Sequence, residues 1–600
     1  MLHKALNIKM NGMDVMAKIL KYLKAKEWML IGIILIFILT QVWLDLKLPD
    51  YMSTITQLVQ TEGSSINEIL NAGVWMLLCA LGSLAASFAV AGLAARVAAN
   101  FSKQLRKLQF DNVEAFSMEN INGFSTASLL TRSTNDITQV QMIIAMGLQA
   151  IIKAPITAVW AVTKIANKGW QWTTATAVAV LVLILMISII IIFAIPKFKK
   201  IQGLTDNLNR ITRENLTGLR VVRAYNAEKY QENKFELANS ELTNNNLFAT
   251  RIMAIMQPGM SVIMNGLSLA IYWIGAYLIN SAGMMDKITL FSNMVVFMSY
   301  AIQVVMSFMM LSMIFIMLPR ASVAARRIAE VIETKPTILE GTVSRSPEDL
   351  KGEVEFRNVS FKYPDAAEYV LNNVSFTAHK GETVAFIGST GSGKSTLINL
   401  VPRFFDATEG EVLIDGVNVR DYTQKALHNK FGYVPQSAVM FSGTVTSNVA
   451  FGDNGGADYT EEDVKKAVEI AQSKDFIEDM PEKYNGAIAQ GGTNLSGGQK
   501  QRLSIARAVC RKPEIYIFDD AFSALDYKTD RVLRSVLKKE TGDTTTLIVA
   551  QRIGTIKDAD KIIVLDEGSV VGIGTHDELM KSCTVYQEIA LSQLSKEELA

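Results

Sequence analysis

Six long apolar stretches, almost free of charged side chains, constrain this chain more than any other feature. A helix needs roughly 20 apolar residues to cross the hydrocarbon core of a bilayer. A charged residue at the centre of such a helix costs about 2.5–3.5 kcal/mol on insertion scales. Only Lys153 interrupts any of the stretches. They therefore predict six membrane-spanning helices: Trp28–Leu44 (with an apolar pattern that continues to Leu48), Ile69–Ala95, Ile137–Thr163, Trp170–Pro196, Ile252–Ile279 and Ile288–Pro319.

The basic residues between these stretches predict their orientation, because cytoplasmic segments are enriched in Lys and Arg. We expect the segments after the second, fourth and sixth stretches to be cytoplasmic, together with both termini. The first two of these are long and polar and lack Gly and Pro clusters, so they are expected to be helical extensions. Their basic residues include Arg96, Lys103, Arg106, Lys107, Arg132, Lys197, Lys199, Lys200, Arg210, Arg213, Arg220 and Arg223, and Arg320, Arg326 and Arg327 follow the sixth stretch. The expected external loop after the first stretch instead carries Asp45, Asp50, Glu62 and Glu68 against Lys47.

Composition and pattern together give the domain boundaries. Residues 1–27 are expected to form an N-terminal amphipathic elbow segment, with Met13–Lys26 as a basic helix on the membrane surface or, alternatively, a soluble capping helix. A cleavable signal peptide is not expected, because no small-residue cleavage pattern follows the lysines. We expect a transmembrane domain over 28–335, a Pro-, Gly- and Ser-containing linker over 336–351, an α/β nucleotide-binding domain over 352–592 and a tail over 593–600.

Charge and cysteine content argue against two other classes of protein. The net charge of +1 gives no case for nucleic-acid binding. The three cysteines, Cys79, Cys510 and Cys583, are too widely spaced to suggest a disulfide framework or a Cys-x-x-Cys metal site.

A phosphate-binding motif opens the soluble half of the chain. Thr383–Ile387 has the pattern of a buried strand, and the motif that follows leads into an apolar helix, which is the strand–loop–helix context of a P-loop. Glycines let backbone N–H groups surround phosphates, and the start of the helix adds positive potential. Lys394 is expected to reach the β- and γ-phosphates of ATP, and Ser395 to bind Mg²⁺. The predicted nucleotide-binding residues are Gly388, Ser389, Thr390, Gly391, Ser392, Gly393, Lys394, Ser395 and Thr396.

A second apolar strand, Ile515–Phe518, ends in Asp519-Asp520. An acidic residue at the end of such a strand is typical of the Walker B segment that holds Mg²⁺ in P-loop NTPases. Asp519 is therefore predicted to be a metal ligand.

The segment Leu495-Ser496-Gly497-Gly498-Gln499 is the signature of the ABC transporter family, and nearly the whole chain resembles an ABC exporter half-transporter. The resemblance implies an α-helical six-span transmembrane domain, an α/β P-loop cassette, and ATP with Mg²⁺ as ligands. It also implies that Tyr363 stacks on adenine, that Gln436 lies near Mg²⁺ and the attacking water, and that Asp526 belongs to the D-loop. In this family Leu495, Ser496, Gly497, Gly498 and Gln499 complete the ATP site of a second cassette. Residues 128–136 and 213–224 resemble the intracellular loops whose short helices dock on the cassettes.

Two residues depart from the family pattern. Asp520 stands where most cassettes have the general-base Glu, and Gln551 stands where they have the switch His. Asp places its carboxylate about 1.5 Å further back, and general-base help is worth about 10²–10⁴-fold in rate. Gln551 can hydrogen-bond the γ-phosphate but cannot carry the charge of an imidazolium. With Gln436, these two residues form the predicted catalytic set.

Because the signature is intact while the catalytic residues are weakened, the pattern resembles the degenerate-site subunit of bacterial heterodimeric multidrug ABC exporters. The expected partner is a second, homologous half-transporter, and this chain's own ATP site is expected to hydrolyse slowly. A homodimer that tolerates Asp520 and Gln551 is the alternative.

The last two spans are rich in methionine, a soft residue that promiscuous apolar surfaces overuse. They suit either a cavity for varied hydrophobic molecules or ordinary helix packing. No acidic residue is expected in the middle of a span, and Lys153 is expected either to face a cavity or to extend toward the interface. The predicted function is ATP-driven export of hydrophobic or amphipathic small molecules across a bacterial plasma membrane by alternating access. A lipid flippase, a peptide exporter and an ATP-gated channel are the alternatives.

Overall fold

The computed structural model describes residues 18–61, 63–166, 169–345, 351–364, 366–456 and 458–593. Residues 1–17 of the predicted elbow segment and residues 594–600 of the predicted tail lie outside these ranges. Gln593, the first residue of the predicted tail, is instead the last residue of the helix α21 (Thr584–Gln593). The chain forms two compact units. The first comprises Met1–Glu114 and Thr126–Thr334, and the second comprises Ala115–Ser125 and Lys335–Ala600.

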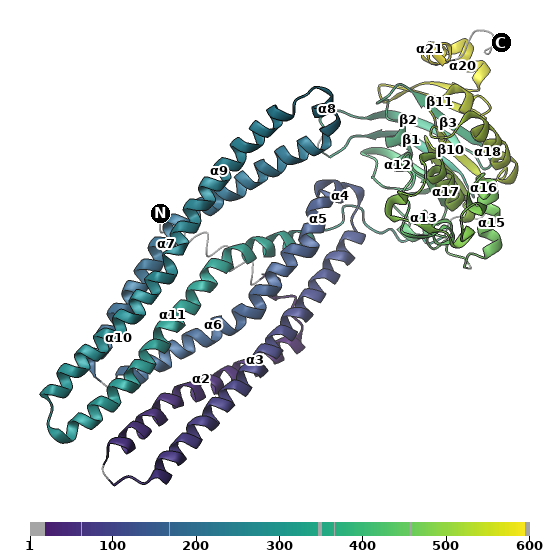
Figure 1. Cartoon of the computed structure of the whole chain (residues 1–600). Helices are drawn as coiled ribbons and strands as arrows, with labels where there is room; N and C mark the ends of the chain where they lie inside the picture. The colour runs from purple at the N-terminus through teal and green to yellow at the C-terminus, as the bar shows by residue number, and fades with distance from the viewer. Residues whose placement is uncertain are drawn as a thin grey trace. The chain divides into compact units, whose positions relative to one another are not determined.

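The first unit consists of helices (Figure 1). Six of its helical stretches are long and apolar enough to span a membrane, which confirms the prediction. α2 packs along α3, α6 packs along α11, and α7 packs against α9 and α10. The elements are α2 (Ala25–Gln60), α3 (Ile66–Glu114), α5 (Thr126–Thr131), the π-helical turn η1 (Arg132–Asp136), α6 (Ile137–Ala166), α7 (Trp170–Thr217), α8 (Leu219–Ala224), α9 (Glu228–Ala254), α10 (Met256–Ser281) and α11 (Met284–Glu333).

Three of these helices extend far beyond their apolar stretches. α3, α7 and α11 contain 49, 48 and 50 residues. At 1.5 Å per residue each is about 75 Å long, against roughly 30 Å for the hydrocarbon core of a bilayer. The polar segments expected to be helical extensions are therefore helical in the structure.

The expectation that Asp45 and Asp50 lie in a loop after the first span is wrong. α2 continues through both residues to Gln60. The physical reason is that lysines of α6 neutralise them: Lys153 Nζ lies 3.2 Å from Asp45 Oδ2, and Lys164 Nζ lies 2.8 Å from Asp50 Oδ2. The helix thus carries acidic residues in its interior, and Lys153 is paired instead of extending alone.

Hydroxyl groups from two further helices complete this arrangement. Ser83 of α3 donates a hydrogen bond to Asp45. The hydroxyl of Tyr300, a fully buried residue of α11, lies 2.7 Å from Asp50 Oδ1 and 3.0 Å from the Leu46 carbonyl oxygen. We call Asp45, Asp50, Ser83, Lys153, Lys164 and Tyr300 the ion-pair cluster. It joins α2, α3, α6 and α11.

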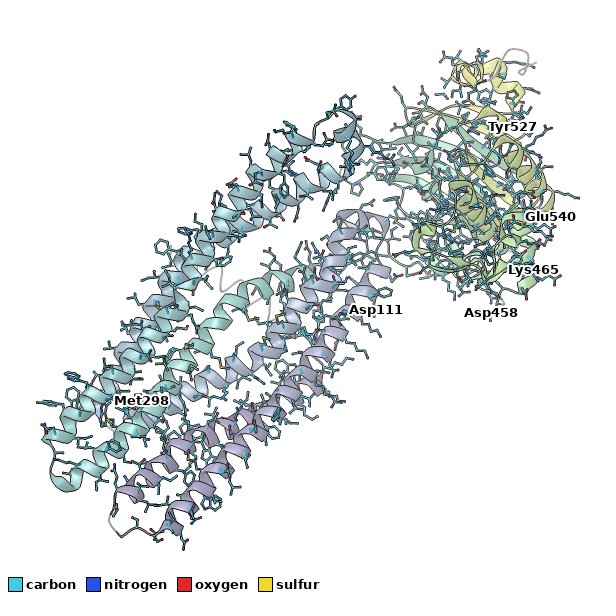
Figure 2. All side chains as sticks on the ribbon, viewed as in Figure 1. Asp111, Met298, Asp458, Lys465, Tyr527 and Glu540 are labelled. Atoms are coloured by element: carbon cyan, nitrogen blue, oxygen red, sulfur yellow. The ribbon has the colours of Figure 1, made fainter. Side chains whose placement is uncertain are left out.

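The methionines of the last two helical stretches occupy several environments. Met260 and Met294 are buried, whereas Met306 and Met310 are 53% and 40% exposed. Met298 lies against the core of the bundle, where Figure 2 labels it. Packing within this chain therefore buries some of these methionines and leaves others exposed.

The second unit contains two main sheets with helices around them. One sheet has six strands in the order β12–β11–β3–β10–β9–β6, and all neighbours are parallel except β11 and β12. The other sheet is antiparallel, in the order β2–β1–β4–β5. The predicted α/β domain is confirmed. Its strands are β1 (Val354–Phe361), β2 (Leu371–Ala378), β3 (Thr383–Gly388), β4 (Glu409–Ile414), β5 (Val417–Asn418), β6 (Phe431–Val434), β7 (Gly443–Thr444), β8 (Ala487–Ile488), β9 (Ile515–Asp519), β10 (Thr545–Val549), β11 (Lys561–Asp566) and β12 (Ser569–Gly574).

Some of the helices of this unit pack against the parallel sheet. Buried Leu503, Phe518 and Leu533 belong to one of its apolar cores. The helices are α4 (Met118–Gly123), α12 (Lys394–Leu400), α13 (Gln424–His428), α14 (Val445–Val449), α15 (Glu461–Ile470), α16 (Lys474–Glu478), α17 (Gly497–Cys510), α18 (Tyr527–Glu540), α19 (Ile553–Ile556), α20 (His576–Ser582) and α21 (Thr584–Gln593).

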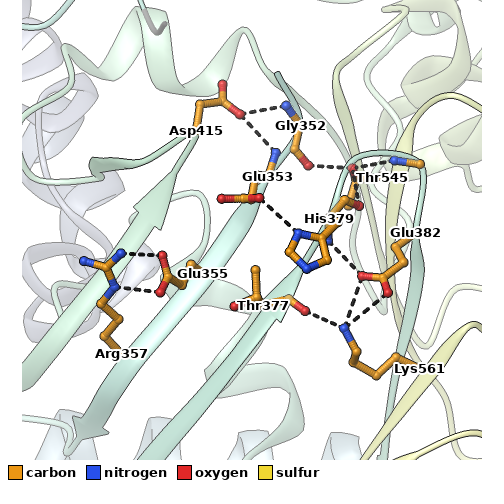
Figure 3. A network of polar contacts seen from close by, with 11 residues as sticks. Gly352, Glu353, Glu355, Arg357, Thr377, His379, Glu382, Asp415, Thr545 and Lys561 are labelled. Carbon is orange, nitrogen blue, oxygen red and sulfur yellow. Dashed lines mark hydrogen bonds and ion pairs between the residues drawn. The ribbon is translucent and has the colours of Figure 1, made fainter. Parts of the chain in front are cut away.

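Polar contacts fasten the two sheets together near the amino ends of β3, β10 and β11 (Figure 3). Asp415 accepts hydrogen bonds from the backbone N–H groups of Gly352 and Glu353 at 2.7 and 3.0 Å. Thr545 Oγ1 donates to the Gly352 carbonyl oxygen, and Lys561 Nζ donates to the Thr377 carbonyl oxygen at 2.7 Å. The predicted site residues lie at the opposite edge of the parallel sheet, at the carboxyl ends of its strands.

Candidate nucleotide-binding site

The predicted site residues follow four neighbouring parallel strands. β3 pairs with β10, β10 with β9, and β9 with β6, all in parallel. The carboxyl ends of these strands consequently meet at one edge of the sheet, where open α/β sheets bind their ligands. The last residues of these strands and the segments that follow them carry the P-loop, Gln551, Asp519 with Asp520, and Gln436.

Two glycines of the P-loop occupy positions that no larger residue fits. A Cβ atom on Gly388 would overlap the carbonyl oxygen of Leu565. Gly393 has a φ of +94°, and a Cβ atom there would lie 2.9 Å from the Val370 carbonyl oxygen. Glycine is therefore required for this path of the backbone, which holds the loop close to neighbouring strands.

Lys394 lies inside the loop that it follows. Its Nζ donates to the carbonyl oxygens of Gly388 and Ser389 at 2.9 and 2.7 Å, and to Ser392 Oγ at 3.2 Å. Burial lowers the pKa of its ammonium group, and the charges of Asp520 and Asp519 oppose this effect. The structure thus places a cation at the centre of the loop that was predicted to hold phosphates.

Ser395 and Asp519 form an oxygen pair beside the loop. Ser395 Oγ donates to Asp519 Oδ1 at 2.9 Å, and Asp519 is 5% exposed. Burial raises the pKa of Asp519, the Ser395 hydrogen bond lowers it, and the neighbouring Asp520 raises it further.

These groups suit Mg²⁺, which prefers oxygen ligands and in nucleotide sites takes one or two carboxylates together with phosphate oxygens and water. Within the described ranges there is no cluster of three His, Cys, Asp or Glu residues that would hold a metal by itself. Ser395, Asp519 and the amide oxygen of Gln436 are the residues that would hold Mg²⁺, and this role stays a prediction.

Asp520 and Gln551 contact each other directly. Gln551 Nε2 donates to Asp520 Oδ2 at 2.8 Å. Asp520 is 9% exposed and has a φ of +48°, which is uncommon for a residue with a side chain. Burial raises the pKa of its carboxyl, and hydrogen bonds from Ser523 and Gln436 and the charge of Arg552 lower it. Three predicted catalytic residues therefore meet at one carboxylate.

Tyr363 lies beside the helix that follows the P-loop. Its hydroxyl is 3.1 Å from Thr396 Oγ1. Its ring makes an edge contact with Phe405, at 5.4 Å between ring centroids. The side chain is half-buried. The location is compatible with the predicted contact to adenine, which stays a prediction.

The signature residues begin α17. Ser496 caps this helix, because its Oγ accepts from the Gln499 N–H at 3.3 Å and its own N–H donates to Gln499 Oε1 at 2.8 Å. A Cβ atom on Gly498 would lie 3.4 Å from the Ala524 carbonyl oxygen. Within the described part of the cassette, no hydrogen bond joins residues 495–499 to the P-loop. Their predicted role toward a second cassette is therefore not tested by this chain alone.

Asp526, the predicted D-loop residue, caps α18. Its Oδ1 accepts from the Thr529 N–H at 3.0 Å. The next residue, Tyr527, which Figure 2 labels, is 73% exposed. The D-loop segment thus ends at the surface of the second unit.

The prediction missed three residues around Asp520 and Gln551. Ser523 and Arg552 act on Asp520. Gln593, at the end of α21, binds the backbone of the Gln551 loop through its side chain. Ser523 and Arg552 lie next to predicted residues in the sequence, and that proximity was an available signal. Gln593 lies 42 residues from Gln551, so local sequence gave no signal.

Two family models match the chain. The model described as ABC transporter matches residues 371–523, and the model described as ABC transporter transmembrane region matches residues 31–328. Among curated proteins, an uncharacterized ABC transporter ATP-binding protein of Mycobacterium bovis is 37% identical over 554 residues, which cover 90% of this chain and 93% of that protein. The uncharacterized ABC transporter ATP-binding protein YfiB of Bacillus subtilis is 34% identical, over 97% of this chain and 99% of that protein.

Two further similarities concern proteins with a described activity. A protein of Pseudomonas fluorescens named ATP-dependent lipid A-core flippase is 32% identical over 495 residues, which cover 82% of this chain and 81% of that protein. A solved structure of a bacterial Atm1-family ABC exporter with ATP bound has a TM-score of 0.78 over 93% of this chain and 98% of that chain, at 24% identity. This structural match supports the fold.

Proposed function

This chain belongs to the ABC transporter family as an exporter-type half-transporter, and we propose that it is the degenerate-site subunit of a heterodimer that exports hydrophobic or amphipathic small molecules. The expected partner is a homologous half-transporter that carries a Walker B Glu and a switch His. In this assembly Ser496, Gly498 and Gln499 complete the partner's ATP site. Lys394, Asp519, Asp520 and Gln551 form a second site that binds ATP and hydrolyses it slowly.

The contact between Gln551 and Asp520 is the observation that carries this proposal. The shorter side chain of Asp520 holds its carboxylate about 1.5 Å further from an attacking water than Glu would. Gln551 Nε2 donates a hydrogen bond to Asp520 Oδ2, one of the two carboxylate oxygens, at 2.8 Å. A base that is displaced and already accepts a hydrogen bond is a weak base, and a displacement near 1 Å costs about 10²-fold in rate. Ser496 of the signature segment caps α17. This ordered helix start supports the proposal that the signature still serves the partner's ATP site.

The Lys and Arg residues that follow the second, fourth and sixth spanning stretches support an orientation with both termini in the cytoplasm. Bacterial relatives support a bacterial plasma membrane. On this view the cassettes of the two subunits close on ATP, the spanning helices turn outward, and hydrolysis at the partner-based site resets the cycle.

The substrate class has a second candidate. The similarity to a protein named ATP-dependent lipid A-core flippase favours a lipid, which is itself an amphipathic molecule. Exposed methionines such as Met306 and Met310 support an adaptable apolar surface for either class. Transport assays in reconstituted vesicles, with a fluorescent lipid and with fluorescent hydrophobic cations, separate the two. A peptide exporter and an ATP-gated channel would transport neither probe.

The first experiment measures ATPase activity of this chain alone and together with the expected partner, a homologous half-transporter that carries a Walker B Glu and a switch His. We expect turnover of the lone chain to be about 10²-fold below that of the pair, the value of a well-placed general base. Replacing the partner's Walker B Glu with Gln should abolish turnover of the pair.

The double variant Asp520→Glu plus Gln551→His restores the Glu and His that most cassettes of the family carry at these positions. It should raise the ATPase activity of the lone chain. Asp458→Glu is the matched control, because it makes the same chemical change at an exposed position of the cassette. Vigorous hydrolysis by the unmodified lone chain would replace the heterodimer with a homodimer in which Asp520 suffices.

A further inference from the structure

A second glutamine, outside the predicted site, holds the loop that carries Gln551. The Nε2 of Gln593 donates to the Gln551 carbonyl oxygen at 2.7 Å. The Oε1 of the same side chain accepts from the Ile553 N–H at 2.9 Å. One side-chain amide thus binds the peptide groups on both sides of Arg552, in the way that a neighbouring strand would.

The helix that carries Gln593 is firmly anchored. Tyr586 and Ala590 of α21 are fully buried, and the Tyr586 hydroxyl lies 2.8 Å from His576 Nδ1. α21 packs against α19, β11 and β3, the strand that leads into the P-loop. Gln593 therefore contacts the Gln551 loop from a helix that packs on the same sheet that carries the nucleotide site.

These contacts form a short path to the catalytic carboxylate. Gln593 fixes the backbone of residue 551, and the side chain of that residue donates to Asp520 at 2.8 Å. With its backbone held, the side chain at 551 moves only by changing rotamer. Because displacements near 1 Å cost about 10²-fold in rate, the position of this backbone matters for any group at 551 that contacts the reacting phosphate.

We propose that Gln593 is a positioning residue for position 551 and thereby for ATP hydrolysis. The inference rests on the proposed function in one respect, that residue 551 contacts the γ-phosphate. It does not depend on which partner completes the transporter.

The test compares two glutamines of α21 that both bind backbone. Gln587 Nε2 donates to the Met580 carbonyl oxygen at 2.8 Å, and among the described residues no hydrogen bond joins its side chain to the Gln551 loop. Gln593→Ala should lower kcat about tenfold, as expected for partial misplacement of one contact, while KM for ATP stays within about twofold. Gln587→Ala should leave both constants unchanged. Gln593→Glu keeps the acceptor for the Ile553 N–H and loses the donor, so it should fall between wild type and Gln593→Ala.

The assay uses full-length protein in lipid nanodiscs and the lone Asp520→Glu plus Gln551→His variant, because the pair hydrolyses ATP at the partner-based site, which residue 551 of this chain does not serve. Failure of the heterodimer proposal appears as vigorous hydrolysis by the lone chain, and the Gln593 comparison then proceeds on that chain. The two results are thus distinguishable.

Hydrogen exchange supplies a readout that does not need turnover. The Ile553 N–H should be protected in wild type and in Gln587→Ala, and should exchange faster in Gln593→Ala at an unchanged melting temperature. An unprotected Ile553 N–H in wild type would overturn the proposal. So would an unchanged kcat in Gln593→Ala once that amide exchanges freely, or an equal loss of kcat in Gln587→Ala.

Discussion

Reversing one charge of the pair between Asp45 and Lys153 should destabilise the helical unit, and reversing both should restore it. The perturbation is Lys153→Asp, Asp45→Lys, and the two together. In the native structure Lys153 Nζ lies 3.2 Å from Asp45 Oδ2, and the side chains are 26% and 27% exposed. Each single change places two like charges where opposite charges meet now.

The size of the effect follows from this distance. Two unit charges 3.2 Å apart interact by about 5 kcal/mol at an effective dielectric constant of 20. Partial exposure and the cost of desolvating both ions offset much of that attraction. We therefore expect an interaction energy of about 2 kcal/mol between positions 45 and 153 in a double-mutant cycle, within the range found for residues in contact. The Ser83 hydroxyl can accept a hydrogen bond from a lysine at position 45.

The assay is thermal unfolding of the purified full-length protein, followed by intrinsic fluorescence. Each single variant should melt several degrees below wild type, and the double variant should recover most of the loss. Lys465→Asp is the matched control, because Lys465 pairs with Glu461 at 2.7 Å on the exposed face of α15. It should cost no more than about 0.5 kcal/mol. Single variants that melt like wild type, or a double variant that melts like the singles, would refute a stabilising role of the pair.

Three further predictions concern the cassette. Gly388→Ala should abolish binding of a fluorescent ATP analogue, because the added methyl overlaps the Leu565 carbonyl oxygen, whereas Gly554→Ala, with open space around its Cβ position, should bind normally. Burial raises the pKa of Asp520, so its contribution to stability is present at low pH and is lost as pH rises through the folded-state value. Asp520→Asn should therefore raise the melting temperature of the nucleotide-free protein at pH 7, and a gain that persisted below about pH 4 would contradict this. Burial also raises the pKa of the Cys510 thiol to about 11, so maleimide should label it at pH 7.5 only after denaturation.

The features that could be predicted from sequence are those that local pattern determines. Charge-free apolar stretches predicted the six helices, since few other structures tolerate such composition at that length. The P-loop and Asp519 could be assigned to one sheet edge because parallel strands bring their carboxyl ends together. Their roles toward ATP and Mg²⁺ stay predictions.

The features that sequence did not reveal depend on contacts between distant segments. Asp45 was expected in a loop because acidic residues inside an apolar helix are costly when they are alone. The structure shows Lys153, 108 residues further on, beside it. Gln593 was assigned to a tail because nothing near it in the sequence relates it to Gln551. Both cases require knowledge of which helices pack together.

The length of α3, α7 and α11 has a mechanical consequence. A rigid rod of about 75 Å converts a small angular change at one end into a large displacement at the other. Tilting such a helix by about 5° about one end moves its far end by roughly 6 Å, more than the pitch of one helical turn. In such a tilt these helices would act as levers, and the ion-pair cluster, which ties α3 and α11 to α2 and α6, would make the four move as a single arm.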